Sequence, residues 1–248
     1  DDSTDHGKEL RLRQEYFFVS ASLQDIIRRY LKNHGSFDQL ADKVAIHLND
    51  THPALAVPEL MRILVDEHRQ DWDTAWGLCQ RIFSYTNHTL MQEALETWPV
   101  ELMGRPLPRH LRIIYDLNAR FLAEVHDKFP GDNELLRRVS LIDERGQRRV
   151  RMASLSVLAS HQVNGVSALH SNLMVETIFA DFAKLWPERF CNKTNGITPR
   201  RWLSQANRPL STLIDARIGK TWRRHLDELS ALRPLAANTC SSPTQQSC

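Results

Sequence analysis

The chain has 248 residues, 42% of them hydrophobic and 25% charged, and 32 lysines and arginines stand against 30 aspartates and glutamates. This composition is typical of a soluble globular protein, and the net charge of +2 argues against a nucleic-acid binder, which usually carries a basic surface. No apolar run approaches the ~20 residues that cross a bilayer. The first eight residues are polar, unlike a secretory signal. We therefore expect a cytoplasmic protein that binds neither nucleic acid nor membrane.

The first third of the chain alternates between helix-like and strand-like segments. After a polar stretch over residues 1–9, apolar residues recur at helical spacing over residues 10–30. Residues 44–48 are short, apolar and partly β-branched, which predicts a strand, and Pro53 and Pro58 then open a helix. A further helix and strand are expected over residues 71–81 and 82–86. This alternation predicts an α/β fold with a parallel sheet.

Each predicted strand ends in a polar turn. The first turn is Asn-Asp-Thr-His at residues 49–52, and the second is Thr-Asn-His-Thr at residues 86–89. In α/β sheets, ligands bind beyond the carboxyl ends of the strands. These side chains offer directional hydrogen bonds without a strong charge of one sign, which suits sugar hydroxyls because these both donate and accept. The turns therefore predict a carbohydrate site.

The rest of the chain predicts more helices, one hairpin and a tail. In chain order we expect a helix over residues 108–129, an exposed hairpin turn over 143–149, an apolar segment over 155–166, a helix over 172–185, and an amphipathic helix over 220–232. From Ala236 onward almost no apolar side chains remain to be buried, so residues 236–248 are predicted to be disordered.

Eleven histidines and four cysteines raise the question of a metal site. Asp50 and His52, together with His161 or His170, are the candidate ligands, but their spacing fits no zinc signature such as H-E-x-x-H. No two cysteines form a C-x-x-C pair. The chain also lacks a G-x-S-x-G nucleophile motif and a phosphate-binding P-loop. We therefore expect no metal site.

Five motifs occur in series between residues 10 and 235. They are L-N-D-T-H-P, continuing to A-L-A-V-P-E-L-M-R, at residues 48–62, Y-T-N-H-T-L at 85–90, L-P-R-H-L at 107–111, V-N-G-V at 163–166, and N-K-T-N-G-I-T-P-R-R-W at 192–202. In this order they resemble the α-glucan phosphorylase family, which comprises glycogen and maltodextrin phosphorylases, in its bacterial form. The chain begins without methionine, which fits a central fragment of such an enzyme.

The resemblance implies a glycosyltransferase. The family phosphorolyses the terminal α-1,4-glucosidic bond of glycogen, starch or maltodextrin with inorganic phosphate, gives glucose 1-phosphate, uses pyridoxal phosphate and is usually homodimeric. Its fold is of the GT-B type, with two Rossmann-like domains and the active site between them. By this resemblance residues 10–194 are the latter part of the N-terminal domain, residues 195–235 begin the C-terminal domain, and residues 236–248 are a tail outside the family pattern.

The resemblance also assigns substrate-binding roles. It implies that His88 and Asn195 hydrogen-bond the 6-hydroxyl of the glucosyl unit being transferred. It implies that Asp50 and His52 line the cleft beside the neighbouring sugar.

Three further positions allow two interpretations. The resemblance places Asn164 and Val166 against the glucose and the cofactor, and Trp202 close to pyridoxal phosphate. A buried turn asparagine, a core valine and a core tryptophan would give the same pattern.

Essential parts of the family pattern are missing from the chain. The lysine that binds the cofactor belongs to a glycine-rich C-terminal motif that is not present, and Lys193 is not that lysine. We therefore expect no covalently bound pyridoxal phosphate, no complete catalytic set and no phosphorolysis by the chain alone. A non-catalytic glucan-binding module and an inert truncated product remain the alternatives.

Regulation by AMP is not expected. Arg28 and Arg29 match the pair that meets the AMP phosphate in animal enzymes, but the following segment over residues 32–39 is short compared with the regulated forms. Gln92 and Thr97 also stand where the family usually has proline and arginine.

Overall fold

The structure is a computed structural model that describes residues 4–236. The chain divides into two units, Asp1–Thr194 and Asn195–Cys248, which are described separately below. The predicted disordered tail lies outside the described residues, except for Ala236, which ends a helix. The assignment of residues 10–194 and 195–235 to the two phosphorylase domains stays a prediction.

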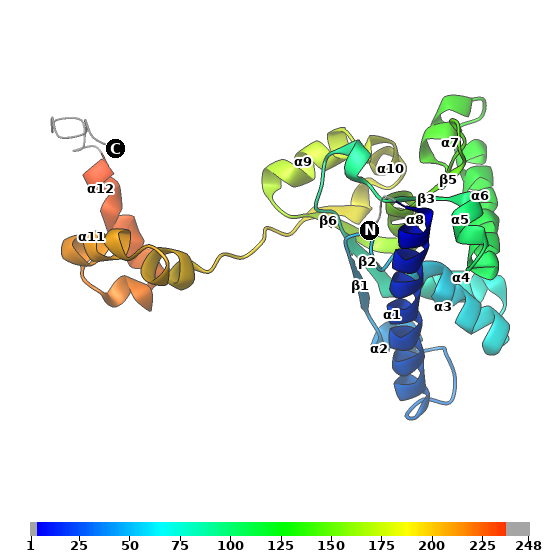
Figure 1. Cartoon of the computed structure of the whole chain (residues 1–248), viewed down its shortest axis with the longest axis horizontal. Coiled ribbons are helices and arrows are strands. Elements are labelled where there is room, and N and C mark those ends of the chain that lie inside the picture. Colours follow the sequence, from blue (N-terminus) through cyan, green and yellow to red (C-terminus); the bar gives the residue numbers. More distant parts are fainter. Residues whose placement is uncertain (1–3, 237–248) are drawn as a thin grey trace. The chain divides into compact units, whose positions relative to one another are not determined.

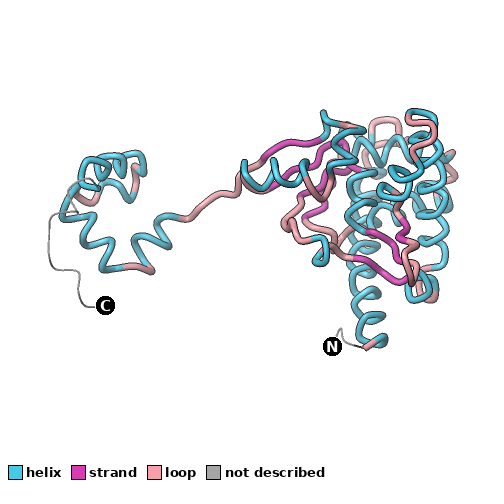
Figure 2. Tube along the Cα trace, turned by 90° about the horizontal axis from the view of Figure 1, so that it is seen from above, coloured by secondary structure: helices cyan, strands magenta, loops and turns pink. Residues whose placement is uncertain are grey.

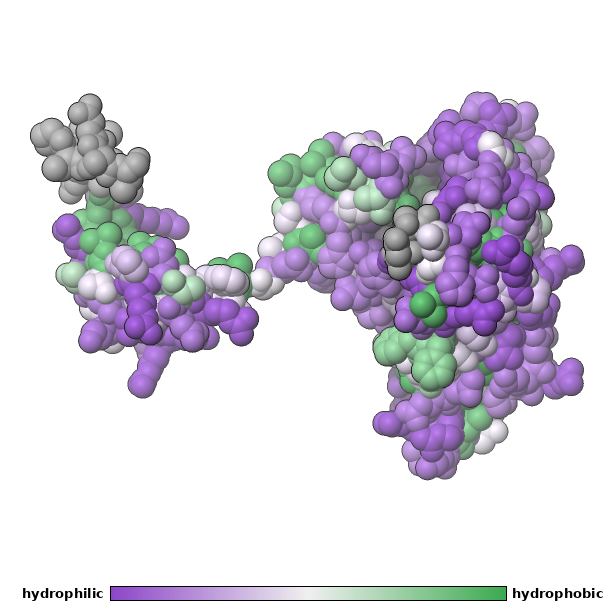
Figure 3. Space-filling view, viewed as in Figure 1, coloured by the Kyte–Doolittle hydropathy of each residue, from purple (hydrophilic) through white to green (hydrophobic). Residues whose placement is uncertain are grey.

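Helix α1 spans Asp5–Leu31, so it begins before the predicted residue 10. The Thr4 hydroxyl accepts a hydrogen bond of 3.0 Å from the backbone N–H of Gly7 and caps the helix. The stretch predicted to be only polar is therefore helical from Asp5 onward. The phenylalanines Phe17 and Phe18 stand 75% and 69% exposed on this helix. Figure 3 shows a green patch over α1 on a mainly purple surface.

A parallel sheet lies at the centre of the first unit. Its strands, in the order β1-β2-β6-β7, are β1 (Ile46–Asn49), β2 (Phe83–Thr86), β6 (Ser160–Gly165) and β7 (Phe190–Asn192). All three pairings are parallel, which confirms the α/β prediction (Figure 2, magenta). Neither β6 nor β7 was predicted as a separate strand.

Within residues 4–194, ten α-helices surround or flank the sheets (Figure 1). Besides α1 they are α2 (Leu40–Lys43), α3 (Ala56–Arg62), α4 (Trp72–Ile82), α5 (Val100–Gly104), α6 (Pro108–Lys128), α7 (Asn133–Val139), α8 (Met152–Ala159), α9 (Ala168–Glu176) and α10 (Ala180–Leu185). A π-helix over Ile63–Glu67 continues α3. Among residues 4–236, no helix combines the length and the apolar character that a membrane span requires.

The helix predicted over residues 172–185 is broken into two. Helix α9 ends before Thr177, whose φ of −121° and ψ of −92° lie outside the helical region. Thr177 and Ile178 are consecutive β-branched residues, which fit poorly into a continuous helix. The Thr177 hydroxyl also donates to the backbone oxygen of Leu173 at 2.6 Å.

Replacing Ser167 by alanine should lower the free energy of unfolding by about 1 kcal/mol. Ser167 caps α9 because its hydroxyl accepts a hydrogen bond of 3.1 Å from the backbone N–H of His170. Urea unfolding of the 248-residue chain measures the change. Ser167→Asn keeps a capping oxygen and should stay close to the wild type. Equal losses in both variants would contradict the capping role.

A second, antiparallel sheet carries the predicted hairpin. Strands β4 (Ile142–Asp143) and β5 (Arg149–Arg151) pair with each other, and β3 (Thr97–Pro99) joins β5 on the other side. Gly146, with φ of 86°, lies in the turn between β4 and β5. The hairpin is confirmed, whereas β3 was not predicted.

The helices of the second unit, over residues 195–236, are short. They are a π-helix over Arg200–Gln205, α11 (Arg208–Ile218), 3-10 helices over Thr221–Arg223 and Leu226–Leu232, and α12 (Arg233–Ala236). The single amphipathic helix predicted over residues 220–232 is therefore wrong. Leu226, Leu229 and Leu232 recur every third residue, which matches the three-residue turn of a 3-10 helix.

Candidate functional site

The polar turns meet at one edge of the parallel sheet. The strand register pairs Asn49 with Thr86 and Thr86 with Asn164, so the carboxyl ends of β1, β2 and β6 lie side by side. The backbone N–H of Asp50 donates to the Thr86 oxygen at 3.1 Å. The backbone N–H of Asn87 donates to the Asn164 oxygen at 3.0 Å. The turns thus form one connected surface beyond the strand ends.

Side chains reinforce this connection. Thr86 Oγ1 donates to Asn164 Oδ1 at 2.6 Å, and both side chains are buried. His88 Nε2 lies 2.6 Å from Asn49 Oδ1, and the His88 ring is exposed. An exposed imidazole that is oriented by a hydrogen bond at one nitrogen has its second nitrogen available to a ligand.

Asp50 has an unusual backbone conformation. Its φ of 66° lies in the left-handed region, which aspartate tolerates better than most residues. One carboxylate oxygen accepts a hydrogen bond of 2.6 Å from the Thr51 backbone N–H. The other oxygen lies 3.9 Å from Nε2 of His52, a residue whose side chain is 59% exposed. The turn therefore presents a carboxylate and an imidazole together.

The segment after β6 packs tightly on the start of α9. A Cβ at Gly165 would lie 2.4 Å from Ser171 Oγ and 2.8 Å from Ser171 Cα, so only glycine fits there. The next backbone N–H, that of Val166, donates to His170 Nδ1 at 3.3 Å. Gly165 therefore lets the end of β6 approach the helix closely.

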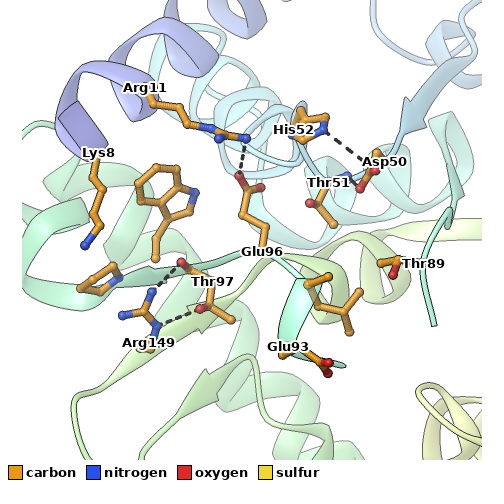
Figure 4. A pocket seen from close by; sticks show the side chains of 14 residues that line it. Lys8, Arg11, Asp50, Thr51, His52, Thr89, Glu93, Glu96, Thr97 and Arg149 are labelled. Carbon is orange, nitrogen blue, oxygen red and sulfur yellow. Dashed lines mark hydrogen bonds and ion pairs between the residues drawn. The ribbon is translucent and has the colours of Figure 1, made fainter. Parts of the chain in front are cut away.

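A cavity of about 380 Å³ opens beside the first turn (Figure 4). Its walls are Lys8, Arg11, Asp50, Thr51, His52, Thr89, Glu93, Ala94, Leu95, Glu96, Thr97, Trp98, Pro99 and Arg149. Of the sequence-predicted residues, it includes Asp50 and His52. His88, Asn164 and Val166 lie at the sheet edge instead and do not line it.

Two glutamates lie close together next to the cavity. The Glu15 and Glu96 side chains are 11% and 14% exposed, and Arg11 lies 3.2 Å from Glu15 and 4.0 Å from Glu96. Burial, and then the charge of Glu96, raise the pKa of Glu15 to about 8. Potential ligand atoms of both glutamates and His52 lie within 4.8 Å of one another, as in sites that hold a metal ion. A proton held at Glu15 relieves the repulsion without a metal.

Two histidines near the sheet edge, His47 and His170, favour the neutral form. Burial, followed by the nearby His88, lowers the pKa of both His47 and His170. This edge is therefore polar without a concentrated positive charge.

Asn195 and Trp202 belong to the second unit. Asn195 is its first residue and is exposed, and Trp202 is 64% exposed. The structure describes this unit by itself, so it does not bring Asn195 together with His88. Trp202 does not lie in a packed core either, since it is mostly exposed. The buried tryptophan of this unit is Trp222.

Sequence reasoning missed most of the cavity walls. Lys8 and Arg11 come from α1, Glu96 and Trp98 from the segment around β3, and Arg149 from β5. These residues lie far apart in the sequence and belong to no shared motif. The packing of α1 against the β3 segment and the pairing of β3 with β5, neither of which has a local signal, bring them together.

The parallel sheet, with hydrogen-bonding side chains at its carboxyl edge, defines an α/β ligand-binding unit. The family model described as carbohydrate phosphorylase matches residues 1–246, and the chain belongs to this family. It is 61% identical to a glycogen phosphorylase of Haemophilus influenzae over 236 residues, covering 95% of this chain and 29% of that protein. It is 55% identical to the muscle form of Homo sapiens, covering 91% of this chain and 28% of that protein.

A Synechocystis glycogen phosphorylase is 55% identical over 93% of this chain and 27% of its own length. The chain thus spans less than a third of these curated relatives.

The cavity does not fit the phosphate group of pyridoxal phosphate, which needs available cations or backbone N–H groups. Lys8 Nζ lies 3.9 Å from an Asp5 carboxylate oxygen. Arg149 donates to the hydroxyl and the backbone oxygen of Thr97 at 2.8 and 3.0 Å. Arg11 is held by the two glutamates. Arg11 and Arg149 are therefore engaged within the protein, whereas Lys8 has an exposed ion pair with Asp5.

Proposed function

We propose that this chain forms one wall of the glucan site of an α-1,4-glucan phosphorylase. The observation that carries the proposal is the connected sheet edge of Asp50, Thr86, His88 and Asn164, in a chain so similar to glycogen phosphorylases. Donors and acceptors held at fixed positions suit sugar hydroxyls. The reaction of the whole enzyme would transfer the terminal glucosyl unit to inorganic phosphate.

Individual residue roles are part of the proposal. His88 would bind the 6-hydroxyl of the transferred glucose, together with Asn195 of the second unit. Asp50 and His52 would line the path of the neighbouring sugar, which agrees with their place at the cavity. Val166 would contact the glucose directly.

The cofactor and the assembly are also proposed. Pyridoxal phosphate would be held by parts of the enzyme outside this chain, with Trp202 near it, which accords with the poor fit of the cavity cations to a phosphate. The whole enzyme would be a cytoplasmic homodimer without AMP control.

The purified 248-residue chain should show no phosphorolysis, because the residues described here supply only part of a catalytic site. Incubation with glycogen and inorganic phosphate, with and without added pyridoxal phosphate, followed by an assay for glucose 1-phosphate, tests this. Release of glucose 1-phosphate above a heat-denatured control would overturn the expectation.

His88→Ala should weaken the binding of maltoheptaose by about 1–3 kcal/mol, because a sugar hydroxyl loses its partner. Isothermal titration calorimetry of the chain measures this. His126→Ala is the matched control, since His126 is an exposed histidine on α6 outside the site. Unchanged affinity in His88→Ala would contradict the assigned role. No binding by the wild type would favour the inert product over the binding module.

A further inference from the structure

A chain of side-chain hydrogen bonds crosses three strands on one face of the parallel sheet. Ser84 Oγ lies 2.8 Å from His47 Nδ1, and His47 Nε2 lies 2.5 Å from Thr86 Oγ1. Thr86 Oγ1 lies 2.6 Å from Asn164 Oδ1, and Asn164 Nδ2 lies 2.9 Å from the backbone oxygen of Gly165. The chain thus runs from β2 to β1, back to β2 and on to the end of β6. These three strands are labelled in Figure 1.

The backbone oxygen of Gly165 fixes the direction of this chain because it can only accept. The Asn164 amide must therefore turn Nδ2 toward Gly165 and Oδ1 toward Thr86. Since Oδ1 also only accepts, the single hydroxyl proton of Thr86 is donated to it. Thr86 Oγ1 then accepts a hydrogen bond from His47 Nε2–H, and the unprotonated Nδ1 accepts from Ser84.

The opposite direction of hydrogen-bond donation along this chain is disfavoured at Asn164, where the chain ends. If Thr86 donated to His47 instead, the Asn164 amide would have to turn around so that Nδ2 donates to Thr86. Asn164 Oδ1 would then face the Gly165 oxygen at the 2.9 Å now spanned by a hydrogen bond, and two acceptors would oppose each other. Thr86 can therefore stay directed at Asn164 only if His47 presents a donor, and not a competing acceptor, at Nε2.

We propose that His47 is a positioning residue of the sugar site, which acts through Thr86 to fix the side-chain amide of Asn164 and, with it, the segment of Gly165 and Val166. The glucan part of this role rests on the proposed function. Asn164 is only 8% exposed, so its amide has no bulk water to replace a lost partner. Partial desolvation of this ring and the nearby His88 lower the pKa of His47, which favours the neutral form with one nitrogen unprotonated.

The tautomer of His47 is tested without any ligand. Long-range ¹H–¹⁵N correlation spectra of the chain labelled at histidine nitrogens should show a neutral His47 with its proton on Nε2 at pH 7. A spectrum with the proton on Nδ1 would overturn the proposal. Ser84→Ala removes only the outer partner and should leave both the tautomer and the Asn164 side-chain amide signals in place.

Three variants test whether His47 acts through Thr86. His47→Ala should shift the Asn164 amide signals and weaken maltoheptaose binding about five- to tenfold. His47→Gln keeps an N–H donor of similar reach and should restore both the signals and the affinity. Thr86→Val should reproduce the alanine effect with His47 intact. Backbone spectra show whether each variant folds. If His47→Ala does not fold, Thr86→Val and His47→Gln remain decisive.

The two proposals fail in different ways. Unchanged Asn164 signals in a folded His47→Ala variant would overturn the positioning role, whatever the glucan affinity and whatever the effect of Thr86→Val. A wild-type chain that binds no maltoheptaose would overturn the proposed function and the glucan role of His47. The spectra would then still decide whether His47 orients Asn164.

Discussion

Glu59→Gln is expected to lower the free energy of unfolding by about 3–5 kcal/mol, which is the usual cost of removing one partner from a buried ion pair. Glu59 on α3 is fully buried. Arg62 donates to its two carboxylate oxygens at 2.8 and 2.9 Å, and His110 Nε2 lies 2.5 Å from one of them. Burial alone would raise the pKa of Glu59, but these hydrogen bonds and one from Ser20 outweigh it and hold the pKa at about 2.

The same arginine supplies a matched control. Glu67 also pairs with Arg62, at 2.8 Å, but its side chain is 46% exposed. Glu67→Gln should therefore cost at most ~1 kcal/mol in urea unfolding. Because the folded-state pKa of Glu59 is depressed, its contribution is present above about pH 4.5 and is lost as the pH falls toward about 2. An equal loss in the free energy of unfolding for Glu59→Gln and Glu67→Gln would contradict the idea that burial makes the Glu59 ion pair more costly to break.

Glu15→Gln is expected to remove a pH dependence of stability. The pKa of Glu15 is raised from 4.5 to about 8, so between these values the folded chain holds a proton that the unfolded chain has lost. The unfolded state then binds fewer protons, and the free energy of unfolding falls by about 1.4 kcal/mol for each pH unit of increase. The stabilisation is complete below pH 4.5 and is lost as the pH rises through about 8.

Urea unfolding at intervals from pH 5 to pH 8.5 measures this slope. The glutamine variant cannot ionise, so its stability should exceed that of the wild type at the upper end of the range. Glu134→Gln is the control, because Glu134 on α7 is 65% exposed and should leave the slope unchanged. The same slope in Glu15→Gln as in the wild type would show that Glu15 does not hold the proton.

Local signals in the sequence were enough for the two turns after β1 and β2, but not for the end of β6. Short β-branched strands followed by Asn, Asp and Thr turns mark where β1 and β2 end, and parallel pairing then forces the two turns together. Pro108 at the first turn of α6 and the Pro130–Gly131 stop give that helix bounds close to those predicted.

Contacts between elements far apart in the sequence could not be predicted from such local signals. Nothing near Glu15 indicates that Glu96 lies against it, since the contact depends on how α1 and the β3 segment pack. The three-residue strand β7 is too short to show a periodicity, and it pairs because β6 presents an open edge. The chain across His47 likewise follows from strand register, which a single sequence does not specify by itself.

The division into two units affects how unfolding is observed optically. Trp98 is 5% exposed in the first unit and Trp222 fully buried in the second, where its Nε1 donates to Asp215 at 2.9 Å. The main core cluster includes Trp98 but not Trp222, so the two indoles report on separate cores. Tryptophan fluorescence of the native chain therefore sums two transitions that need not coincide. In a Trp222→Phe background the emission change should follow mainly the first unit, where Glu15 and Glu59 act.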